Sequence, residues 1–458
     1  LIQSYFWVPS YEEQTRGNPA RLTEYISASI GDASILNPVL SADSASSQIE
    51  SLVFEGLLDR DKNLRFRGRV ARSWDISEEA YFYFNKNAAI PGHGRLDAAG
   101  VVDLLNHTLK APPADTRLRE CLQHIRSVSL LPPRSFSVTK EERSPQKSGA
   151  SRNIPFTVDA PPRIQLVLNR VDQELFNTLE RLLGKDYFRK FDSRPSVHTT
   201  TKLDRQSLNS YARMLLPATE HNPVIVFHLR KGIRFHDGHP LTADDVKFTY
   251  EAIMDPKNLS PRISDYEPVK TVEVTDPLTV KVTYKRLYSP ALGTWGMGIL
   301  PKHLLNRKAM RAEAISRGEN PDTFSLRKSR FNRHPVGSGP FRFEQWKTDQ
   351  FITLQRNEDY WEGPPNYKRY YFRIIPDLLT QEMEFYAGTV DSYSVQPHQV
   401  ERLQSDRRYQ SFSGTSFGYT YIGYNMRRKP FDDPKVRRAL GMAIDVNKII
   451  QYVLYGQG

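Results

Sequence analysis

Residues 226–246 constrain the fold of this chain most, because they combine a strand, a tight turn and a capped helix. Phe227 and Leu229 alternate with Val226, His228 and Arg230, which is the period-2 pattern of a half-buried strand. Asp237-Gly238 is a turn dipeptide, since glycine tolerates positive φ and aspartate bonds the backbone ahead of it. Thr242 fits a helix N-cap and is followed by two acidic residues in the first turn. The segment contains no catalytic constellation.

Three further groups of residues follow a family pattern in the family's order. They are Leu36–Asp43 with Leu52–Leu58, Pro335–Phe341 with Arg356–Trp361, and Tyr421–Asn425 with Pro430–Leu440. With these segments the chain resembles the family 5 extracellular solute-binding proteins, periplasmic receptors that deliver oligopeptides, dipeptides, nickel chelates and related solutes to ABC importers. The resemblance implies an α/β protein with the two-lobe architecture of periplasmic binding proteins (class II, cluster C type).

Composition excludes several classes of protein. The net charge is +12, but the basic residues are scattered among acids and accompany no nucleic-acid-binding motif, so we expect no nucleic acid partner. No run approaches the roughly 18 to 20 apolar residues that span a bilayer, so we expect no membrane span. Cys121 is the only cysteine, which rules out an intrachain disulfide.

The sequence offers little for catalysis or metal binding. The acidic pairs Asp244-Asp245 and Asp432-Asp433 stand at predicted helix starts, where capping explains them. The segment Gly337–Gly339 lacks the nucleophile-elbow pattern, and Cys121 has no nucleophile motif around it. Histidines at 236 and 239 flank Asp237, but their spacing matches no zinc site. We therefore predict no enzyme, no cofactor and no metal.

We expect three parts along the chain. Residues 1–54 and 316–414 are predicted to form the core domain of the first lobe, and residues 55–315 an enlarged second domain of that lobe. Residues 415–458 are predicted to begin the second lobe, with amphipathic helices at 434–444 and 446–455. Because two helices cannot form a lobe, we expect the second lobe to be incomplete in this chain.

The middle block is about 145 residues longer than the family pattern requires. Leu96–Val101 matches Leu241–Val246 at an offset of 241 − 96 = 145, and Lys86 matches Lys231 at the same offset. We therefore predict an internal duplication of residues 82–190 and 227–305, each copy beginning with a strand, a turn and a helix. The alternative is an unrelated insertion, since this pattern is easily imitated.

The resemblance also suggests residues that line a ligand cleft. They are Ala42, Asp43, Ser44, Ala45, Tyr266, Trp295, Tyr421 and Tyr424. For each aromatic residue the alternative is ordinary core packing. Family members that bind peptides hold the ligand's α-amine with an acidic residue from the part of the second lobe that we expect this chain to lack.

The leading functional hypothesis is a receptor that binds a peptide-like ligand, or another small solute, between two lobes. It would deliver the ligand to a membrane ABC permease complex, from the periplasm or from a lipid anchor on the outer face of the cytoplasmic membrane. The alternative keeps the fold but uses it as a non-transport sensor or accessory component. A hydrolase on an unrelated fold would require a nucleophile and base that the sequence does not offer.

Overall fold

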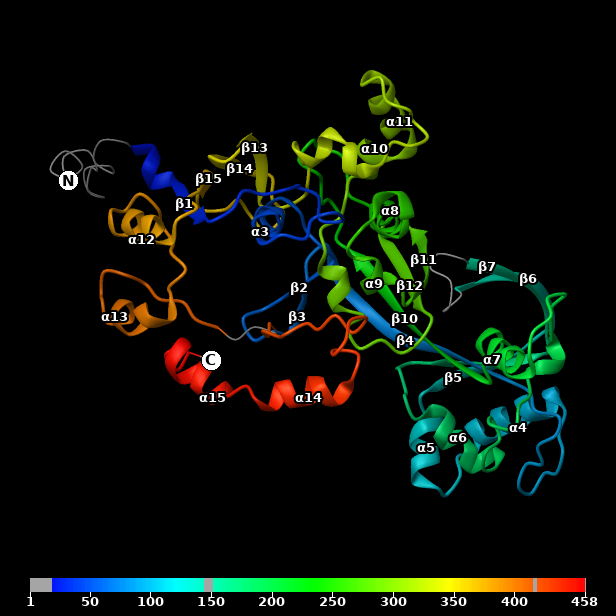
Figure 1. Ribbon diagram of the computed structural model, residues 1–458. Helices are drawn as coiled ribbons and strands as arrows, with labels where there is room; N and C mark the ends of the chain where they lie inside the picture. Colours follow the sequence, from blue (N-terminus) through cyan, green and yellow to red (C-terminus); the bar gives the residue numbers. More distant parts are fainter. Residues whose placement is uncertain (1–18, 144–150, 415–417, 458) are drawn as a thin grey trace. The chain divides into compact units, whose positions relative to one another are not determined.

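The computed structural model describes residues 19–143, 151–414 and 418–457, which divide into two compact units (Figure 1). Of the described residues, the main unit comprises 20–25, 29–143 and 151–374, and the C-terminal unit comprises 19, 26–28, 375–414 and 418–457. The predicted domain limits at 54, 315 and 414 differ from these limits and stay predictions. Of the predicted segment 1–54, residues 1–18 lie outside the described part.

Helices and strands alternate along the chain, which confirms the predicted α/β class. The strands are β1 Glu24–Ser29, β2 Leu58–Arg60, β3 Phe66–Gly68, β4 Ala71–Tyr83, β5 Ile125–Leu131, β6 Arg134–Arg143, β7 Ser151–Ala160, β8 Arg163–Leu168, β9 Val197–His198, β10 Thr219–Leu229, β11 Val269–Asp276, β12 Thr279–Tyr284, β13 Phe341–Lys347, β14 Phe351–Arg356 and β15 Arg369–Ile374. The α-helices are α3 Ser44–Val53, α4 Ala98–Lys110, α5 Thr116–Leu122, α6 Leu175–Leu183, α7 Arg205–Leu215, α8 Ala243–Met254, α9 Ile263–Tyr266, α10 Lys302–Leu305, α11 Arg307–Ser316, α12 Leu378–Tyr386, α13 Val400–Gln404, α14 Pro434–Met442 and α15 Val446–Lys448.

The largest sheet has six antiparallel strands in the order β11-β12-β10-β4-β8-β5 (Figure 1). Its central strands, β4 and β10, pair along their length, from Phe82 with Thr219 to Ala71 with Leu229. Residues 226–229 of β10 alternate between half-buried and buried, as their sequence pattern predicts. A second sheet has the order β1-β15-β14-β13, and a third has the order β6-β7-β9.

The two halves of the six-stranded sheet have the same plan. Each central strand, β4 or β10, is followed by a helix, α4 or α8, then by the outermost strand, β5 or β11, and finally by the strand between, β8 or β12. Helix α4 packs on β5 and β8, and α8 packs on β11 and β12. The two helices begin at Ala98 and Ala243, and 243 − 98 = 145. The predicted strand, turn and helix are thus present in both segments.

The strand registers of the two halves also match. Glu78 pairs with Pro223 in the central ladder, and since 223 − 78 = 145, these corresponding positions face each other. The outer ladders share one register shift, which follows Ile125 in β5 and Val269 in β11; β11 has a second shift after Val274 that β5 lacks. Bulges are specific features of a ladder, not accidents of pairing. The duplication itself remains a proposal, which the matched order and bulges support.

Each half of the sheet contributes to a separate hydrophobic core. One cluster joins β10, β12 and α8 to α3 and to the strands β13–β15; it includes Ile49, Phe227 and Ile352. Another joins α4, α5 and α6 to the far end of β4 and to β8; it includes Phe82 and Leu105. The segment that exceeds the family pattern therefore has its own core.

In the C-terminal unit the predicted helix 434–444 is present as α14. Asp433 caps it through a hydrogen bond from the N–H of Lys435, and Pro434 occupies its first position. The predicted helix 446–455 is present as α15 and a following π-helical turn, Ile449–Val453. Leu440 is exposed and Ile450 half-buried. That these apolar faces pack on a further part of a second lobe stays a prediction.

Candidate ligand-binding surface

The predicted site residues 42–45 lie at the N-terminal end of α3 in the main unit. Asp43 is the N-cap of the helix, and one of its carboxylate oxygens, Oδ1, accepts the N–H of Ser46 at 2.7 Å. Ala42 and Ser44 are exposed on either side of Asp43, whereas Ala45 is buried. Ala42, Asp43 and Ser44 are therefore accessible, and Ala45 supports them from the core.

The second Asp43 oxygen is held by two hydroxyl groups. Oδ2 accepts hydrogen bonds from Ser34 Oγ at 2.5 Å and from Ser46 Oγ at 2.8 Å, and Ser46 Oγ in turn accepts the N–H of Ser34. Partial burial opposes ionisation of Asp43, but these bonds outweigh it and lower the pKa of the carboxyl group. Asp43 is therefore an oriented anion that also fastens the 32–35 loop to the helix.

An open depression of about 520 Å³, here called the basic depression, adjoins this loop. Its lining residues are Ser34, Ile35, Arg317, Arg327, Lys328, Ser329, Arg330, Asn332 and Arg333. Five of these side chains are cationic and none is acidic. Carboxylates and phosphates are the anions that guanidinium groups bind best, so this lining suits such a group.

The cations of the basic depression differ in how they are engaged. Glu319 forms ion pairs with Arg317 at 3.1 Å and with Lys328 at 2.6 Å. The Arg327 guanidinium donates to backbone carbonyls. Arg330 is exposed, and among the described residues its side chain has no hydrogen-bond or ion-pair partner. Arg330 is thus the cation best placed to meet an anion from solution.

Tyr266 and Trp295 lie in the core of the main unit, 3% and 4% exposed. Their rings contact each other edge to face at 5.5 Å. Trp295 Nε1 donates to the hydroxyl of Tyr284 at 2.9 Å, and the Tyr266 hydroxyl donates to the carbonyl of Thr294. The void beside them measures about 10 Å³, which is no more than one water needs. These positions correspond to core packing, the alternative considered for each aromatic residue.

Tyr421 and Tyr424 belong to the C-terminal unit. Tyr421 is 74% exposed, and its ring centroid lies 5.7 Å from that of Tyr419. Tyr424 is half-buried against Phe431, at 5.3 Å. Tyr421 is therefore available for stacking, while Tyr424 also packs within its own unit.

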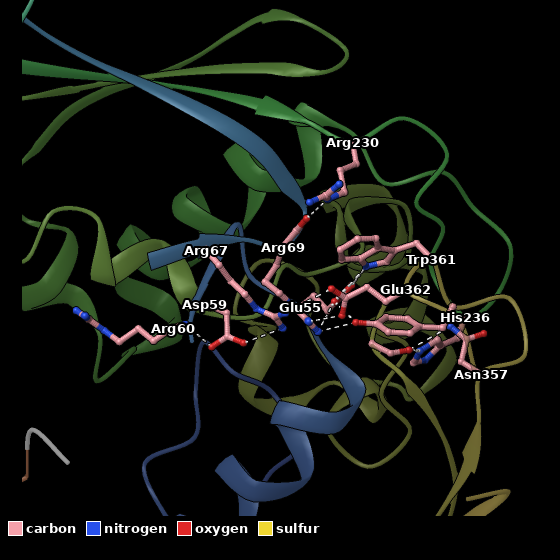
Figure 2. A network of polar contacts seen from close by, with 12 residues as sticks. Glu55, Asp59, Arg60, Arg67, Arg69, Arg230, His236, Asn357, Trp361 and Glu362 are labelled. Atoms are coloured by element: carbon pink, nitrogen blue, oxygen red, sulfur yellow. Dashed lines mark hydrogen bonds and ion pairs between the residues drawn. The ribbon is translucent and has the colours of Figure 1, made fainter. Parts of the chain in front are cut away.

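A buried polar network joins the family segments of the main unit, and sequence reasoning assigned no role to its residues (Figure 2). Figure 2 shows Arg69 pointing toward Glu55 and Glu362, with ion pairs of 2.8 and 2.6 Å. Glu55 also accepts hydrogen bonds from the hydroxyl of Tyr360 at 2.6 Å and from Nε1 of Trp361. Burial raises the pKa of Glu55, against these bonds and the charge of Arg69. The sequence signal that could have revealed this network is a charged residue next to an apolar one, as in Phe54-Glu55 and Arg69-Val70.

The network extends to the turn that follows β10. The guanidinium of Arg230 lies 4.3 Å from the ring centroid of Trp361 and donates to the carbonyl of Arg69. His236 Nδ1 accepts the N–H of Gly337, and its Nε2 lies 3.0 Å from the carbonyl of Gly339. Burial lowers the pKa of His236 to about 4, so the ring is neutral. These contacts hold the end of α3 in place.

Gly337 and Gly339 explain the Gly-Ser-Gly segment. A Cβ at Gly337 would lie 1.9 Å from the carbonyl oxygen of Val53, and one at Gly339 would lie 2.5 Å from that of Leu52. The N–H of Gly339 donates to Val53 at 2.9 Å. Glycine is needed because this backbone lies directly against the last turn of α3.

In each acidic pair, the second aspartate has the predicted capping role, whereas Asp244 forms an ion pair with Lys302. Asp245 completes a capping box with Thr242 and also accepts the N–H of Lys302 at 3.0 Å. Asp433 caps α14.

Cys121 is buried, which raises the pKa of its thiol to about 12 and leaves little reactive thiolate. In the part of the chain that the structure describes, no helix is long and apolar enough to cross a membrane.

Comparison with known proteins extends these observations. The family described as bacterial extracellular solute-binding proteins, family 5 Middle, matches residues 219–458. The oligopeptide-binding protein AppA of Bacillus subtilis is 35% identical over 235 residues, which cover 50% of this chain and 40% of AppA. Heme-binding protein A of Haemophilus influenzae is 32% identical over 251 residues, which cover 51% of this chain and 44% of that protein.

Among solved structures, that of AppA from Bacillus subtilis in complex with a nonapeptide is similar, with a TM-score of 0.54 and 22% identity. The match covers 94% of this chain and 56% of AppA, so the chain shares the fold of a binding protein but spans about half its length. The matched family accounts for more than half of the residues, from the first strand residue of β10 onward. The chain belongs to family 5 of the bacterial extracellular solute-binding proteins.

Proposed function

We propose that this chain is part of a solute receptor that binds a peptide-like ligand between two lobes and delivers it to an ABC importer. The observation that carries the proposal is the family match over residues 219–458. It is supported by the names of the relatives, one an oligopeptide-binding and one a heme-binding protein. We place the receptor in the periplasm or on a lipid anchor at the outer face of the cytoplasmic membrane.

The main unit would contribute an anion and a group of cations to the ligand. Ala42, Asp43 and Ser44 are accessible at the start of α3, and Asp43 is held ionised by its hydrogen bonds. The basic depression adjoins the same loop through Ser34. A peptide carries an amine and a carboxylate, so we assign its carboxylate to the basic depression, with Arg330 as the first contact.

Some of the remaining predicted residues would contact the ligand, and the others would support the site from the core. Tyr421 and Tyr424 would stack on the ligand, since Tyr421 is exposed and aromatic faces bind apolar side chains. Ala45, Tyr266 and Trp295 would act from the core, by fixing the backbone beneath the surface. We propose binding without chemical conversion, because the acids on these surfaces are engaged as helix caps and Cys121 is buried.

Calorimetric titration with matched peptides tests the proposal. Peptides with a free C-terminal carboxylate should bind more tightly than their amidated forms. Arg330→Ala should weaken binding of the free acids by about 1–2 kcal/mol, because a charge-assisted hydrogen bond is lost, and should leave the amides unchanged. Arg307→Ala is the matched control, since Arg307 is also exposed but lies outside the basic depression.

Three outcomes would count against the proposal or part of it. Equal affinity for acids and amides would remove the basic depression from the site. Unchanged affinity in a Tyr421→Ala, Tyr424→Ala double variant would reassign both tyrosines to packing within their unit. Turnover of any peptide would overturn the receptor function itself.

A further inference from the structure

Three side chains that can ligate a metal meet beside the turn that follows β10. One ligand atom from each of Asp237, His239 and His303 lies within 4.8 Å of the others. His303 Nε2 is 2.6 Å from Asp237 Oδ2, and the rings of His239 and His303 are stacked with centroids 3.9 Å apart. His303 follows Asp237 by 66 residues, which is why spacing in the sequence did not reveal the cluster.

The fold holds these residues on rigid elements. Asp237 and His239 stand in a closed turn, in which Phe235 and His239 are joined by a backbone hydrogen bond and the N–H of His239 donates to Asp237 Oδ1 at 3.1 Å. His303 is the second residue of α10, whose first residue, Lys302, is bonded through its N–H to Asp245 of α8. The cluster thus bridges the turn and α10, and the ends of both are fixed by other contacts.

We propose that Asp237, His239 and His303 form a binding site for a late first-row transition-metal ion such as Zn²⁺. Two imidazoles and one carboxylate are the donors that such ions prefer over the oxygen-only sets of Mg²⁺ and Ca²⁺. Three protein ligands leave a coordination position open to water or to a solute. The site is distinct from the proposed peptide surface and does not depend on it.

Binding would require a small local rearrangement. Stacked rings do not both direct a nitrogen at one ion, so His239 would rotate about its side-chain bonds, which its exposure allows. His303 Nε2 would exchange its contact with Asp237 for the metal, and both residues would then share the ion. Ligand distances of about 2.0–2.2 Å are within reach, because the atoms already lie close together.

Two cations adjacent in sequence to the turn and to His303 have acceptors outside the cluster. Lys302 Nζ forms an ion pair with Asp244 at 2.8 Å, and the Arg234 guanidinium donates to the carbonyl of Gly238 at 2.8 Å. Each therefore has its own acceptor.

Metal titration of the chain tests the proposal, with Zn²⁺ for calorimetry and Co²⁺ for visible absorption. At a pH above the ordinary imidazole pKa of about 6.5, we expect one saturable Zn²⁺ site and no competition from Mg²⁺ or Ca²⁺. His239→Ala and His303→Gln should each weaken Zn²⁺ binding at least ~10-fold. His303→Gln keeps a donor to Asp237 and so separates loss of the metal ligand from loss of the turn.

His228→Ala is the matched control. His228 of β10 forms a similar histidine-aspartate pair, with its Nε2 2.9 Å from Oδ2 of Asp75 in β4. This pair is not part of the metal-ligand cluster. Its replacement should leave Zn²⁺ binding unchanged. Absence of saturable Zn²⁺ binding by the unmodified chain, or binding that survives both His239→Ala and His303→Gln, would overturn the proposal and leave the cluster as a hydrogen-bonded turn.

Discussion

The two halves of the six-stranded sheet share a plan but differ in what their helix starts contact. In the β4 half, Asp97 caps α4 through the N–H of Gly100 at 2.7 Å. In the β10 half, the position corresponding to Gly100 is Asp245, which closes a capping box and also binds the backbone of Lys302. Both solutions start a helix. At this position the β10 half therefore has a side-chain contact to a neighbouring segment where the β4 half has a glycine.

The halves also differ in how their cores connect. Phe227 belongs to the cluster that reaches α3 and the strands β13–β15, whereas Phe82 belongs to the cluster formed with α4, α5 and α6. Phe82 and Phe227 are corresponding positions, since 227 − 82 = 145, and both are 0–1% exposed. The comparison predicts that damage to either core stays within its own half.

Replacing these two phenylalanines is the strongest way to break the comparison. Phe82→Ala and Phe227→Ala should each destabilise the chain by about 3–5 kcal/mol, because each leaves a large cavity. Hydrogen exchange followed by mass spectrometry should show faster exchange in α4 and α6 for Phe82→Ala, and in α8 for Phe227→Ala. Equal changes in both halves for either variant would show a single shared core.

Ion pairs of similar length but different burial sharpen the comparison. Arg69 and Glu55 are 2.8 Å apart with side chains 14% and 2% exposed, whereas Arg181 and Asp115 are 2.7 Å apart and much more exposed. Arg69→Ala should cost about 3–5 kcal/mol of unfolding free energy, since it leaves a buried carboxylate unpaired. Arg181→Ala should cause no measurable change, because solvent screens the pair. Urea denaturation measures both, and a large loss for Arg181→Ala would contradict the argument.

A buried acid gives the core around α3 a pH dependence. Burial raises the pKa of Glu50 from 4.5 to about 7, against a hydrogen bond from Ser41 Oγ. Between these two values the unfolded chain loses the proton and the folded chain keeps it, so stability falls as pH rises and levels off above pH 7. Glu50→Gln should thus be more stable than the parent at about pH 8, by at most about 3 kcal/mol, and similar to it at about pH 4.

Thermal denaturation across that pH range tests the Glu50 prediction. Glu120→Gln, an exposed change in α5 of the other half, is the control and should follow the parent at every pH. If Glu50→Gln were less stable than the parent at about pH 8, the carboxylate would be a net contributor to the fold.

The sequence predicted those structural elements that depend on residues close together in the chain. The alternation at 226–229 and the cap at Thr242 are local, so the strand, turn and helix of the β10 half were predictable. The matching segment at 96–101 extended the prediction to α4. Sheet order was beyond this reasoning, because the pairing of β4 with both β8 and β10 joins segments far apart in the chain.

The candidate site was predictable only in part, for the same reason. Asp43 was proposed as a cleft residue from the family resemblance, and the structure shows it as the N-cap of α3. The basic depression was not predicted, since Arg330 and Ser34, which both line it, are far apart in the sequence. Aromatic side chains near a family segment are equally consistent with a core and a cleft, and Trp295 lies in the core because its indole bonds Tyr284 there.

The long central ladder also bears on how the chain reaches its fold. Phe82 and Thr219 are paired neighbours although 219 − 82 = 137 residues separate them, and such distant contacts slow folding. The hydrophobic cluster of the intervening segment has no buried member in β10, so we expect it to form before the ladder closes. Once that cluster is formed, the N–H of Tyr83 and the carbonyl of Ala218 are 3.2 Å apart, so β10 begins where β4 ends. Because this segment precedes the family segment in the chain, we expect it to fold first during synthesis and to present β4 for pairing with β10.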